Sequence, residues 1–98
     1  MIRVILPAHL KVLANISGDI DVEPEGTPTI ASVVRAIETR FPALRGTILQ
    51  HGSRRRRPMV RFYACNADLS HDDPESALPD AVRNGSEPLL IIGAIAGG

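Results

Sequence analysis

Near its end the chain carries a short segment, residues 89–92, in which every residue is a branched aliphatic. Side chains along a strand point alternately to opposite faces of the sheet, so a strand here would be apolar on both faces. Strands with one wet face alternate apolar and polar residues, whereas strands covered on both faces do not. The segment therefore predicts a central strand, around which the other elements are arranged.

This strand leads directly into Ala-Ile-Ala-Gly-Gly, residues 94–98. A chain terminus normally frays and carries no core residues. Here apolar residues continue up to the two terminal glycines. Because glycine has no Cβ, its backbone can lie flat in a narrow channel. The pattern points to the carboxylate of Gly98, preceded by Gly97, as the functional group. The alternative is a frayed end without a function.

Length and composition limit the function classes. Ninety-eight residues suffice for one small domain with a single core, expected to span 1–98. Eleven basic and eleven acidic residues cancel, so no overall field attracts nucleic acid or an acidic membrane. The single cysteine, Cys65, cannot form an internal disulfide and fits a reducing cytoplasm. No stretch approaches the roughly 20 apolar residues of a membrane span, and no signal-peptide pattern is present.

Periodicity predicts the remaining elements. Period-two alternation indicates strands at 2–6, 20–23 and 59–65, with the first two forming a hairpin. Apolar residues from Ile30 to Leu44 recur every three or four positions and predict a helix that stops near Phe41, before Pro42. Thr27 or Thr29 caps it, and Pro28 suits the first turn if Thr27 is the cap.

Other stretches give weaker signals. Residues 9–14 are ambiguous, 66–68 resemble a tight turn, and 70–84 are acidic and irregular, tethered by Leu69, Leu78 and Val82. The element order favours an α+β domain with one main helix packed on one face of a small mixed sheet. One helix covers only one face. Either a loop covers the other face, or Leu90 and Ile92 form an apolar patch beside the tail that docks on a partner.

The run Arg54, Arg55, Arg56 and Arg57 is the strongest local charge. A solvated loop is the favoured interpretation, and an electrostatic contact with an acidic partner is the functional alternative. A nucleic-acid site is disfavoured because no aromatic stacking platform lies beside these residues.

The cysteine, the histidines and the acidic cluster give little evidence of a functional site. Cys65 follows an apolar strand and is expected to be a buried structural cysteine. His9, His51 and His71 lack ligand spacing, so no metal site is expected. The carboxylates of Asp72, Asp73 and Glu75 are expected to form a solvated face rather than an acid–base pair.

Four segments of the chain resemble the MoaD/ThiS family of ubiquitin-like sulfur carriers: Met-Ile-Arg-Val at the start, Thr-Ile-Ala-Ser-Val-Val-Arg-Ala-Ile-Glu, Ala-Cys-Asn-Ala-Asp, and the ending Pro-Leu-Leu-Ile-Ile-Gly-Ala-Ile-Ala-Gly-Gly. The tail is most like that of the CysO type, and the resemblance spans the whole chain. The run at 54–57 is outside the family pattern. Asn84-Gly85-Ser86 stands where many members carry Asp-Gly-Asp.

The resemblance implies a β-grasp, ubiquitin-like fold with a flexible C-terminal tail, 94–98. It also implies that an adenylating enzyme threads the tail, Ala94, Ile95, Ala96, Gly97 and Gly98, into its ATP site. Adenylation of the Gly98 carboxylate and attack by a sulfur donor would leave a thiocarboxylate, which a downstream sulfur-accepting synthase or hydrolase would use. The chain would then be a protein cosubstrate of that enzyme, with no bound cofactor of its own.

Two other functions stay open. A ubiquitin-like modifier would use the same adenylation but pass its acyl group to a lysine amine. A plain interaction module would use the segment Arg54 to Arg57 and the apolar strand face, and would not need Gly97 and Gly98. The sequence does not distinguish thiamin, molybdopterin and cysteine biosynthesis as the pathway.

Overall fold

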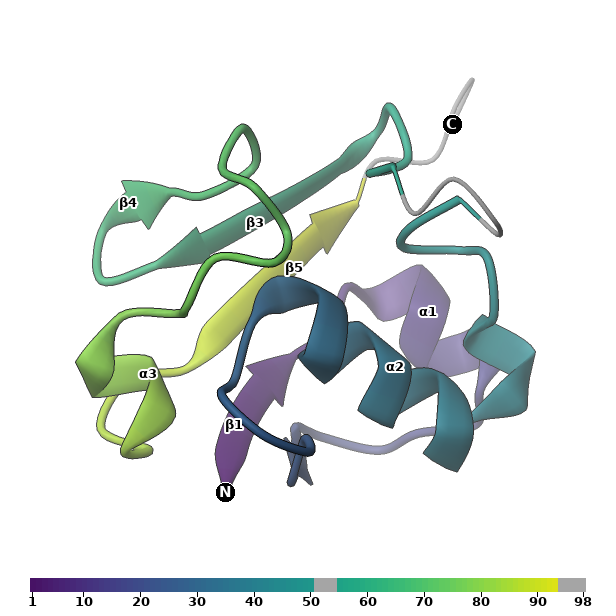
Figure 1. The fold of residues 1–98 in the computed structure, drawn as a ribbon. Coiled ribbons are helices and arrows are strands. Elements are labelled where there is room, and N and C mark those ends of the chain that lie inside the picture. The colour runs from purple at the N-terminus through teal and green to yellow at the C-terminus, as the bar shows by residue number, and fades with distance from the viewer. Residues whose placement is uncertain (51–54, 94–98) are drawn as a thin grey trace.

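The structure is a computed structural model that describes residues 1–50 and 55–93, and all structural statements below concern those residues. Helices lie between strands at three places along the chain, and only β3 is followed directly by another strand (Figure 1). In order they are β1 (Ile2–Ile5), α1 (Ala8–Leu13), β2 (Ile20–Val22), α2 (Ile30–Arg40), the 3-10 helix η1 (Pro42–Leu44), β3 (Val60–Ala64), β4 (Ala67–Asp68), α3 (Asp80–Arg83) and β5 (Leu89–Gly93).

The last described strand is the centre of the sheet. The strand order is β2-β1-β5-β3-β4, so β5 has a neighbour on each side. It runs parallel to β1, with Ile5 opposite Leu90, and antiparallel to β3, with Phe62 opposite Ile91. The predicted central strand and the hairpin of β1 with β2 are both confirmed.

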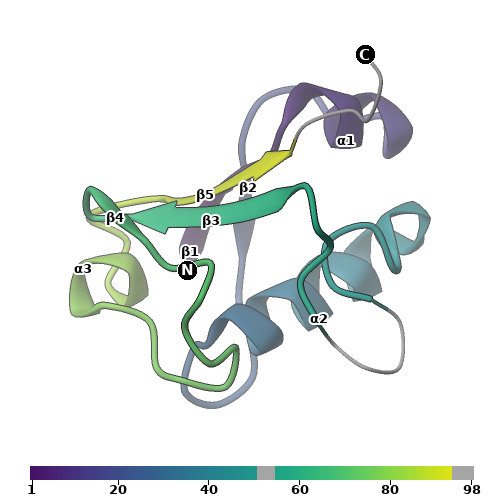
Figure 2. The same ribbon diagram turned by 90° about the horizontal axis from the view of Figure 1, so that it is seen from above.

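A single long helix covers one face of this sheet. Figure 2 shows the sheet nearly edge-on, with α2 on one side and α1 at the end toward which β5 runs. Val33, Val34 and Ile37 of α2 are fully buried, and alternate residues of the strands bury their side chains in the same core. The architecture is the predicted α+β arrangement, a mixed five-stranded sheet with one main helix, which is a β-grasp fold.

The boundaries of α2 follow from local chemistry. Thr29 is the N-cap: its hydroxyl accepts a hydrogen bond from the Ser32 N–H at 3.0 Å, and the Ser32 hydroxyl accepts one from the Thr29 N–H at 2.8 Å. This reciprocal capping satisfies backbone donors that the first turn leaves unpaired. Pro28 therefore precedes the cap, and the alternative with Thr27 as the cap is wrong. The helix ends at Arg40, as Pro42 requires.

The ambiguous stretch after β1 is the short helix α1. Pro7 precedes its first turn, and Asn15, with a φ of 57°, lies just beyond its last turn. Only Leu10 is fully buried, whereas Val12 and Leu13 are 81% and 53% exposed. With one core residue in six, the segment carries too little helical periodicity to be identified from its pattern.

The connection from β3 to β4 corrects two predictions. Ala64 pairs with Ala67, and the two residues between them, Cys65 and Asn66, have φ values of 52° and 62°. Positive φ at both positions is the signature of a tight type I′ hairpin turn. Ala67 and Asp68 are therefore strand residues rather than part of the turn. Cys65 is exposed at the hairpin tip, so the prediction that it is buried is wrong.

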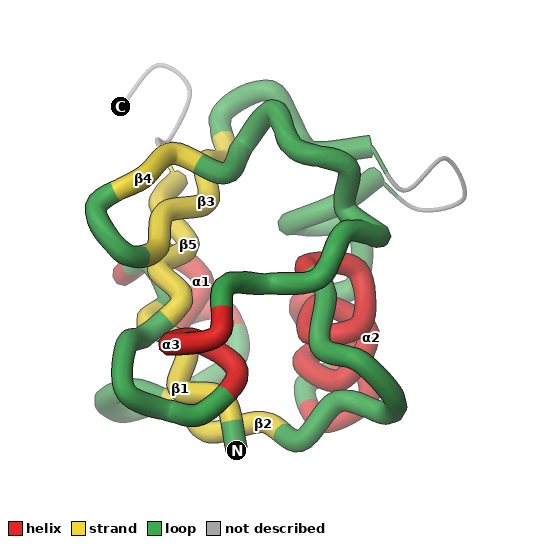
Figure 3. The backbone as a smooth tube through the Cα atoms, turned by 60° about the vertical axis from the view of Figure 1, so that its left-hand side comes forward, coloured by secondary structure: helices red, strands yellow, loops and turns green. Residues whose placement is uncertain are grey.

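The segment between β4 and α3 joins the sheet to the main helix. It crosses from the sheet to α2 and returns to α3 (Figure 3). Backbone hydrogen bonds fix the crossing: the Ala31 N–H donates to the Pro74 carbonyl at 2.9 Å, and the Leu78 N–H donates to that of Pro28 at 3.0 Å. The predicted tethers are confirmed, because Leu69, Leu78 and Val82 are buried. The predicted irregular stretch nevertheless includes α3, Asp80–Arg83.

Among the described residues, no helix is long and apolar enough to cross a membrane.

The capping geometry gives a first prediction. Thr29→Ala removes the acceptor for the Ser32 N–H and should lower the free energy of unfolding by about 1 kcal/mol. The control is Thr27→Ala, because Thr27 is exposed and is not the cap. Urea unfolding monitored by circular dichroism measures both variants, and equal losses would contradict the assignment of Thr29 as the cap.

Candidate functional site

The root of the C-terminal tail is the end of the central strand. Gly93 closes β5 opposite Val60, the first residue of β3, so the ladder between the two strands ends there. β5 therefore ends at one end of the sheet, and the chain continues from there. The predicted tail residues Ala94, Ile95, Ala96, Gly97 and Gly98 lie outside the described residues.

On its other side β5 loses its strand partner earlier. The ladder with β1 ends at the pair of Ile5 and Leu90, and the chain then turns through Pro7 into α1. Proline has no N–H to donate, so it suits the end of a ladder. The start of α1 lies against Gly93: a Cβ at Gly93 would be 2.7 Å from His9 Cε1 and 3.6 Å from Pro7 Cγ.

The sheet face opposite α2 carries the two predicted docking residues of β5. Leu90 is half-buried in a row with Ile5 of β1 and Tyr63 of β3, and such cross-strand neighbours each contribute roughly 0.2–1 kcal/mol. Ile92 is 45% exposed and lies opposite Arg61. On this face Leu90 is therefore partly covered by its neighbours and Ile92 is exposed, and docking of a partner there stays a prediction.

Charged groups lie on the same face as Ile92, toward the β3–β4 edge. Arg61 Nη1 is 4.0 Å from an Asp68 carboxylate oxygen and 3.5 Å from His71 Nε2. Hydrogen bonds from the side chain and backbone N–H of Ser70 lower the pKa of Asp68 below its ordinary value, and the charge of Arg61 adds to the shift. Asp68 is therefore a carboxylate at neutral pH and forms an exposed ion pair with Arg61, the residue opposite Ile92.

The described part of the arginine run is partly structural. Arg54 lies outside the described residues, and Arg55 and Arg57 are exposed. Arg56 is half-buried: its Nη1 donates to the Val60 carbonyl at 2.7 Å and its Nε donates to the Ser70 carbonyl at 3.1 Å. The expected solvated loop therefore does not describe Arg56, whose guanidinium ties β3 to the segment after β4.

Backbone pairing holds the same segment in place. The Gln50 N–H donates to the Arg55 carbonyl at 2.6 Å, the Arg57 N–H donates to the Ile48 carbonyl at 3.0 Å, and Leu49 and Arg56 form a β-bridge. Ile48 and Leu49 are buried, so the arginines are attached to the core through them. The position of Arg55 and Arg57 is therefore set by the fold.

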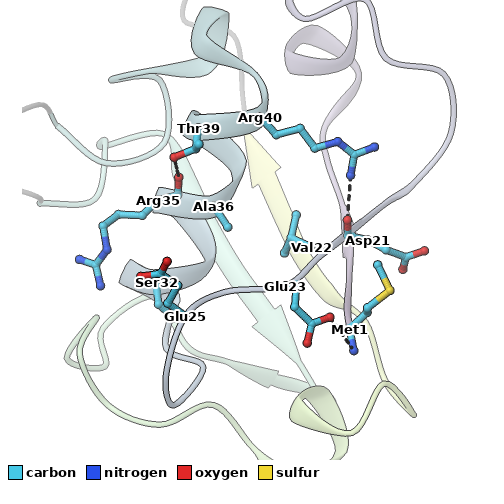
Figure 4. A pocket seen from close by; sticks show the side chains of 10 residues that line it. All are labelled: Met1, Asp21, Val22, Glu23, Glu25, Ser32, Arg35, Ala36, Thr39 and Arg40. Atoms are coloured by element: carbon cyan, nitrogen blue, oxygen red, sulfur yellow. Dashed lines mark hydrogen bonds and ion pairs between the residues drawn. The ribbon is translucent and has the colours of Figure 1, made fainter.

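A pocket lies away from the end of β5. A pocket of about 710 Å³ lies between the edge strand β2 and α2, and β1 separates β2 from β5. Its lining carries both signs of charge, Arg35 and Arg40 of α2 and acidic residues of and after β2, and Arg40 reaches toward Asp21 whereas Arg35 points away from β2 (Figure 4). Arg40 Nη1 donates to the Asp21 carbonyl at 2.8 Å, which blocks part of the strand edge. No single ligand charge fits this lining.

The described residues hold no metal-ligating group. No three histidine, cysteine or acidic side chains among them are clustered in a way that could bind an ion. Asp72, Asp73 and Glu75 are exposed. The Asp73 carboxylate accepts a hydrogen bond from the Glu75 backbone N–H at 2.9 Å, which stabilises a turn. This agrees with the predicted solvated face.

Sequence reasoning missed the contact between His9 and Gly93. His9 was considered only as a possible metal ligand, and Gly93 only as part of the apolar strand. One signal was present, because a glycine within a strand often marks a close approach of another group. The approaching group could not be identified, because α1 had no clear helical pattern.

Comparison with known proteins gives structures only, because no family model and no curated protein sequence matches the chain. A structure of the Amycolatopsis orientalis BexX/CysO complex contains a chain that matches with a TM-score of 0.74 at 17% identity, covering 100% of both chains. SAMP1 from Haloferax volcanii matches at 0.71 and 18%, covering 98% of this chain and 97% of that one. SAMP1 of Methanosarcina acetivorans, a small archaeal modifier protein, matches at 0.69 and 19%, covering 98% and 94%.

These likenesses extend over whole chains at low sequence identity. They show that this chain shares the β-grasp, ubiquitin-like fold of CysO and SAMP1 from end to end. Because none of the identities reaches 20%, side-chain functions do not follow from the fold.

The role of Arg56 is testable by stability. Arg56→Ala removes a charged donor from the Val60 and Ser70 carbonyls and should lower the free energy of unfolding by about 1–3 kcal/mol. Arg45→Ala, at an exposed arginine after η1, is the control and should change it by less than about 0.5 kcal/mol. Chemical denaturation measures both, and a neutral Arg56→Ala would rule out the structural role.

Proposed function

We propose that this chain is a sulfur carrier of the MoaD/ThiS type, whose reactive group is the carboxylate of Gly98. A partner enzyme adenylates this carboxylate with ATP, a sulfur donor converts it to a thiocarboxylate, and a downstream synthase or hydrolase uses the sulfur. The chain is the recycled protein cosubstrate in this cycle. It acts in the cytoplasm, where Cys65 stays reduced.

One observation carries the proposal: the fold of CysO and SAMP1 over the whole chain is combined here with a central strand that ends at Gly93. Five residues, 94–98, follow that strand and end in Gly-Gly. Five extended residues span at most about 17 Å, enough for the carboxylate to enter a cleft while the folded domain remains outside. The CysO structure is that of a complex with BexX, which supports an enzyme partner for this chain as well.

The chemistry needs little from the folded domain. A Gly98 carboxylate oxygen attacks the α-phosphate of ATP, pyrophosphate leaves, and an acyl adenylate forms. The sulfur donor then attacks the carbonyl carbon and AMP leaves, because a phosphate ester is a much better leaving group than oxide. Gly97 lets the backbone pass through a narrow channel, where a Cβ would contact the walls. The catalytic groups belong to the partner.

The domain contributes the docking surface. Ile92 precedes Gly93 directly, so a partner that binds the tail would contact Ile92 and also Leu90, which lies on the same face of β5. Burial of an exposed apolar side chain stabilises a complex. Arg54 to Arg57 add positive charge for an acidic rim on the partner, and the exposed Arg57 keeps its charge at the surface although its Nε donates to the Gly46 carbonyl at 2.6 Å.

A ubiquitin-like modifier is the second candidate, because two of the matching structures are of a protein named small archaeal modifier protein. Both candidates share adenylation of Gly98. They differ in the nucleophile that resolves the acyl intermediate, which is sulfur for a carrier and a lysine amine for a modifier. A plain interaction module would need neither Gly97 nor Gly98.

Intact mass spectrometry tests the proposal directly. The full chain is incubated with ATP, sulfide and a candidate adenylating enzyme of the same cell. The expected product is heavier by the replacement of one oxygen by sulfur, and fragmentation places the change at Gly98.

Two comparisons make the result decisive. A chain lacking Gly97 and Gly98 should remain folded and gain no sulfur. Conjugates to lysine without a thiocarboxylate would favour the modifier. Absence of both products with every cognate adenylating enzyme, together with full cellular function of the shortened chain, would leave the interaction module.

The docking surface gives a separate prediction. Ile92→Asp places a charge in the apolar contact and should raise the KM of the adenylating enzyme for the carrier by about tenfold or more, as for a central interface residue. Val12→Asp is the matched control, because Val12 is also an exposed aliphatic, 81% exposed, but lies on α1.

Steady-state release of pyrophosphate measures KM for both variants. Equal effects at positions 92 and 12 would show that the sheet face is not the docking surface.

A further inference from the structure

The imidazole of His9 occupies the place where residue 93 would carry a side chain. A Cβ at Gly93 would be 2.7 Å from His9 Cε1 and 3.3 Å from His9 Nε2. Carbon–carbon contacts are optimal at about 3.5–4.0 Å, so the ring and any side chain at position 93 exclude each other. Gly93 is the only glycine in the described strands.

The demand for glycine at this position does not come from the core. The colliding atoms belong to the far end of a side chain that is only half-buried, and the ring could rotate away. Gly93 also has no positive φ that would call for glycine. A methyl group at residue 93 would therefore be accommodated by displacing His9, at small cost to folding.

The contact lies where the strand partners of β5 end. On one side β3 reaches only to Val60, opposite Gly93, and on the other side β1 pairs only as far as Leu90. Side chains of a strand point out of the faces of the sheet, so His9 and Pro7, which lie near the Cβ position of Gly93, pack over one face of the chain at Gly93. They lie there beyond the point where β1 stops pairing with β5.

From this geometry we infer that His9 is a positioning residue for the tail, which sets the direction in which the chain leaves β5 after Gly93. Gly93 and His9 act as a matched pair: the glycine makes room for the ring, and the ring limits the conformations of the glycine backbone. Glycine is the residue with the most backbone freedom, so an unrestrained Gly93 would point the tail in many directions. If His9 limits these directions before binding, less conformational entropy of the tail is lost when the partner enzyme binds it.

The kinetic part of this inference rests on the proposed function. His9→Ala should raise the KM of the adenylating enzyme for the carrier by about three- to tenfold with kcat unchanged, because only the ordering of the tail is lost. Gly93→Ala should do the same by displacing the ring. The double variant should be no worse than the worse single variant, because both changes break one contact.

Controls separate positioning from a general effect on α1. Val12→Ala, on the exposed side of the same helix, should leave KM unchanged. Thermal unfolding of His9→Ala should occur within a few degrees of the unaltered chain, the shift expected for less than about 1 kcal/mol.

A second readout does not involve the enzyme. In NMR spectra of the full chain, an NOE should connect the His9 Hε1 proton to the Gly93 Hα protons. His9→Ala should lower the order parameter of the Gly93 amide, whereas Val12→Ala should not. An unchanged KM and unchanged order parameters in His9→Ala, or additive losses in the double variant, would overturn the inference. If the unaltered chain is not adenylated while the NMR differences are present, the proposed function fails and the positioning role stands.

Discussion

Every other part of this structure depends on the burial of β5 as the central strand. Its pairing with β1 is parallel and brings together segments more than eighty residues apart, whereas its pairing with β3 is antiparallel. Contacts of such long range form only after much chain entropy is lost, so the apolar side chains of β5 must compensate for it. Leu89 and Ile91 do so by packing in the core beneath α2, each at most 2% exposed. A strand held this firmly can end in a functional tail without fraying the domain.

The two faces of β5 are used differently. Leu89 and Ile91 face α2 and contribute to stability, whereas Leu90 and Ile92 face away from it. Leu90 is partly covered by its neighbours in the sheet, and Ile92 is left 45% exposed opposite Arg61, which pairs with Asp68. This gradient from buried to exposed runs toward the end of the strand. The exposed apolar side chain of this face, Ile92, is therefore the residue next to Gly93, at the end of the described strand.

Arg56 shows why charge runs are hard to interpret without a fold. Four adjacent arginines look equivalent in a sequence, and net charge treats them as one patch. In the structure Arg56 donates to carbonyls of β3 and of the segment after β4, whereas Arg55 and Arg57 are exposed. Burial and hydrogen bonding of one guanidinium depend on which carbonyls the chain brings near it. Arg57 also donates to the Gly46 carbonyl, at 2.6 Å, but remains exposed, so neighbouring arginines of one run differ in burial and in the contacts that they make.

By itself, the sequence determined the features that rest on local patterns: the apolar central strand, the amphipathic helix α2 with its stop before Pro42, the β1–β2 hairpin and the Gly-Gly ending. These patterns act within a few residues, where side-chain periodicity and backbone preferences dominate. Four features became clear only from the tertiary structure. Thr29 rather than Thr27 is the cap, Cys65 is exposed at a hairpin tip, residues 8–13 form a helix, and His9 lies against Gly93. Each of these outcomes depends on a contact between segments or on a turn geometry that several sequences allow. Periodicity identifies which residues are buried, but only packing in three dimensions determines which residues meet.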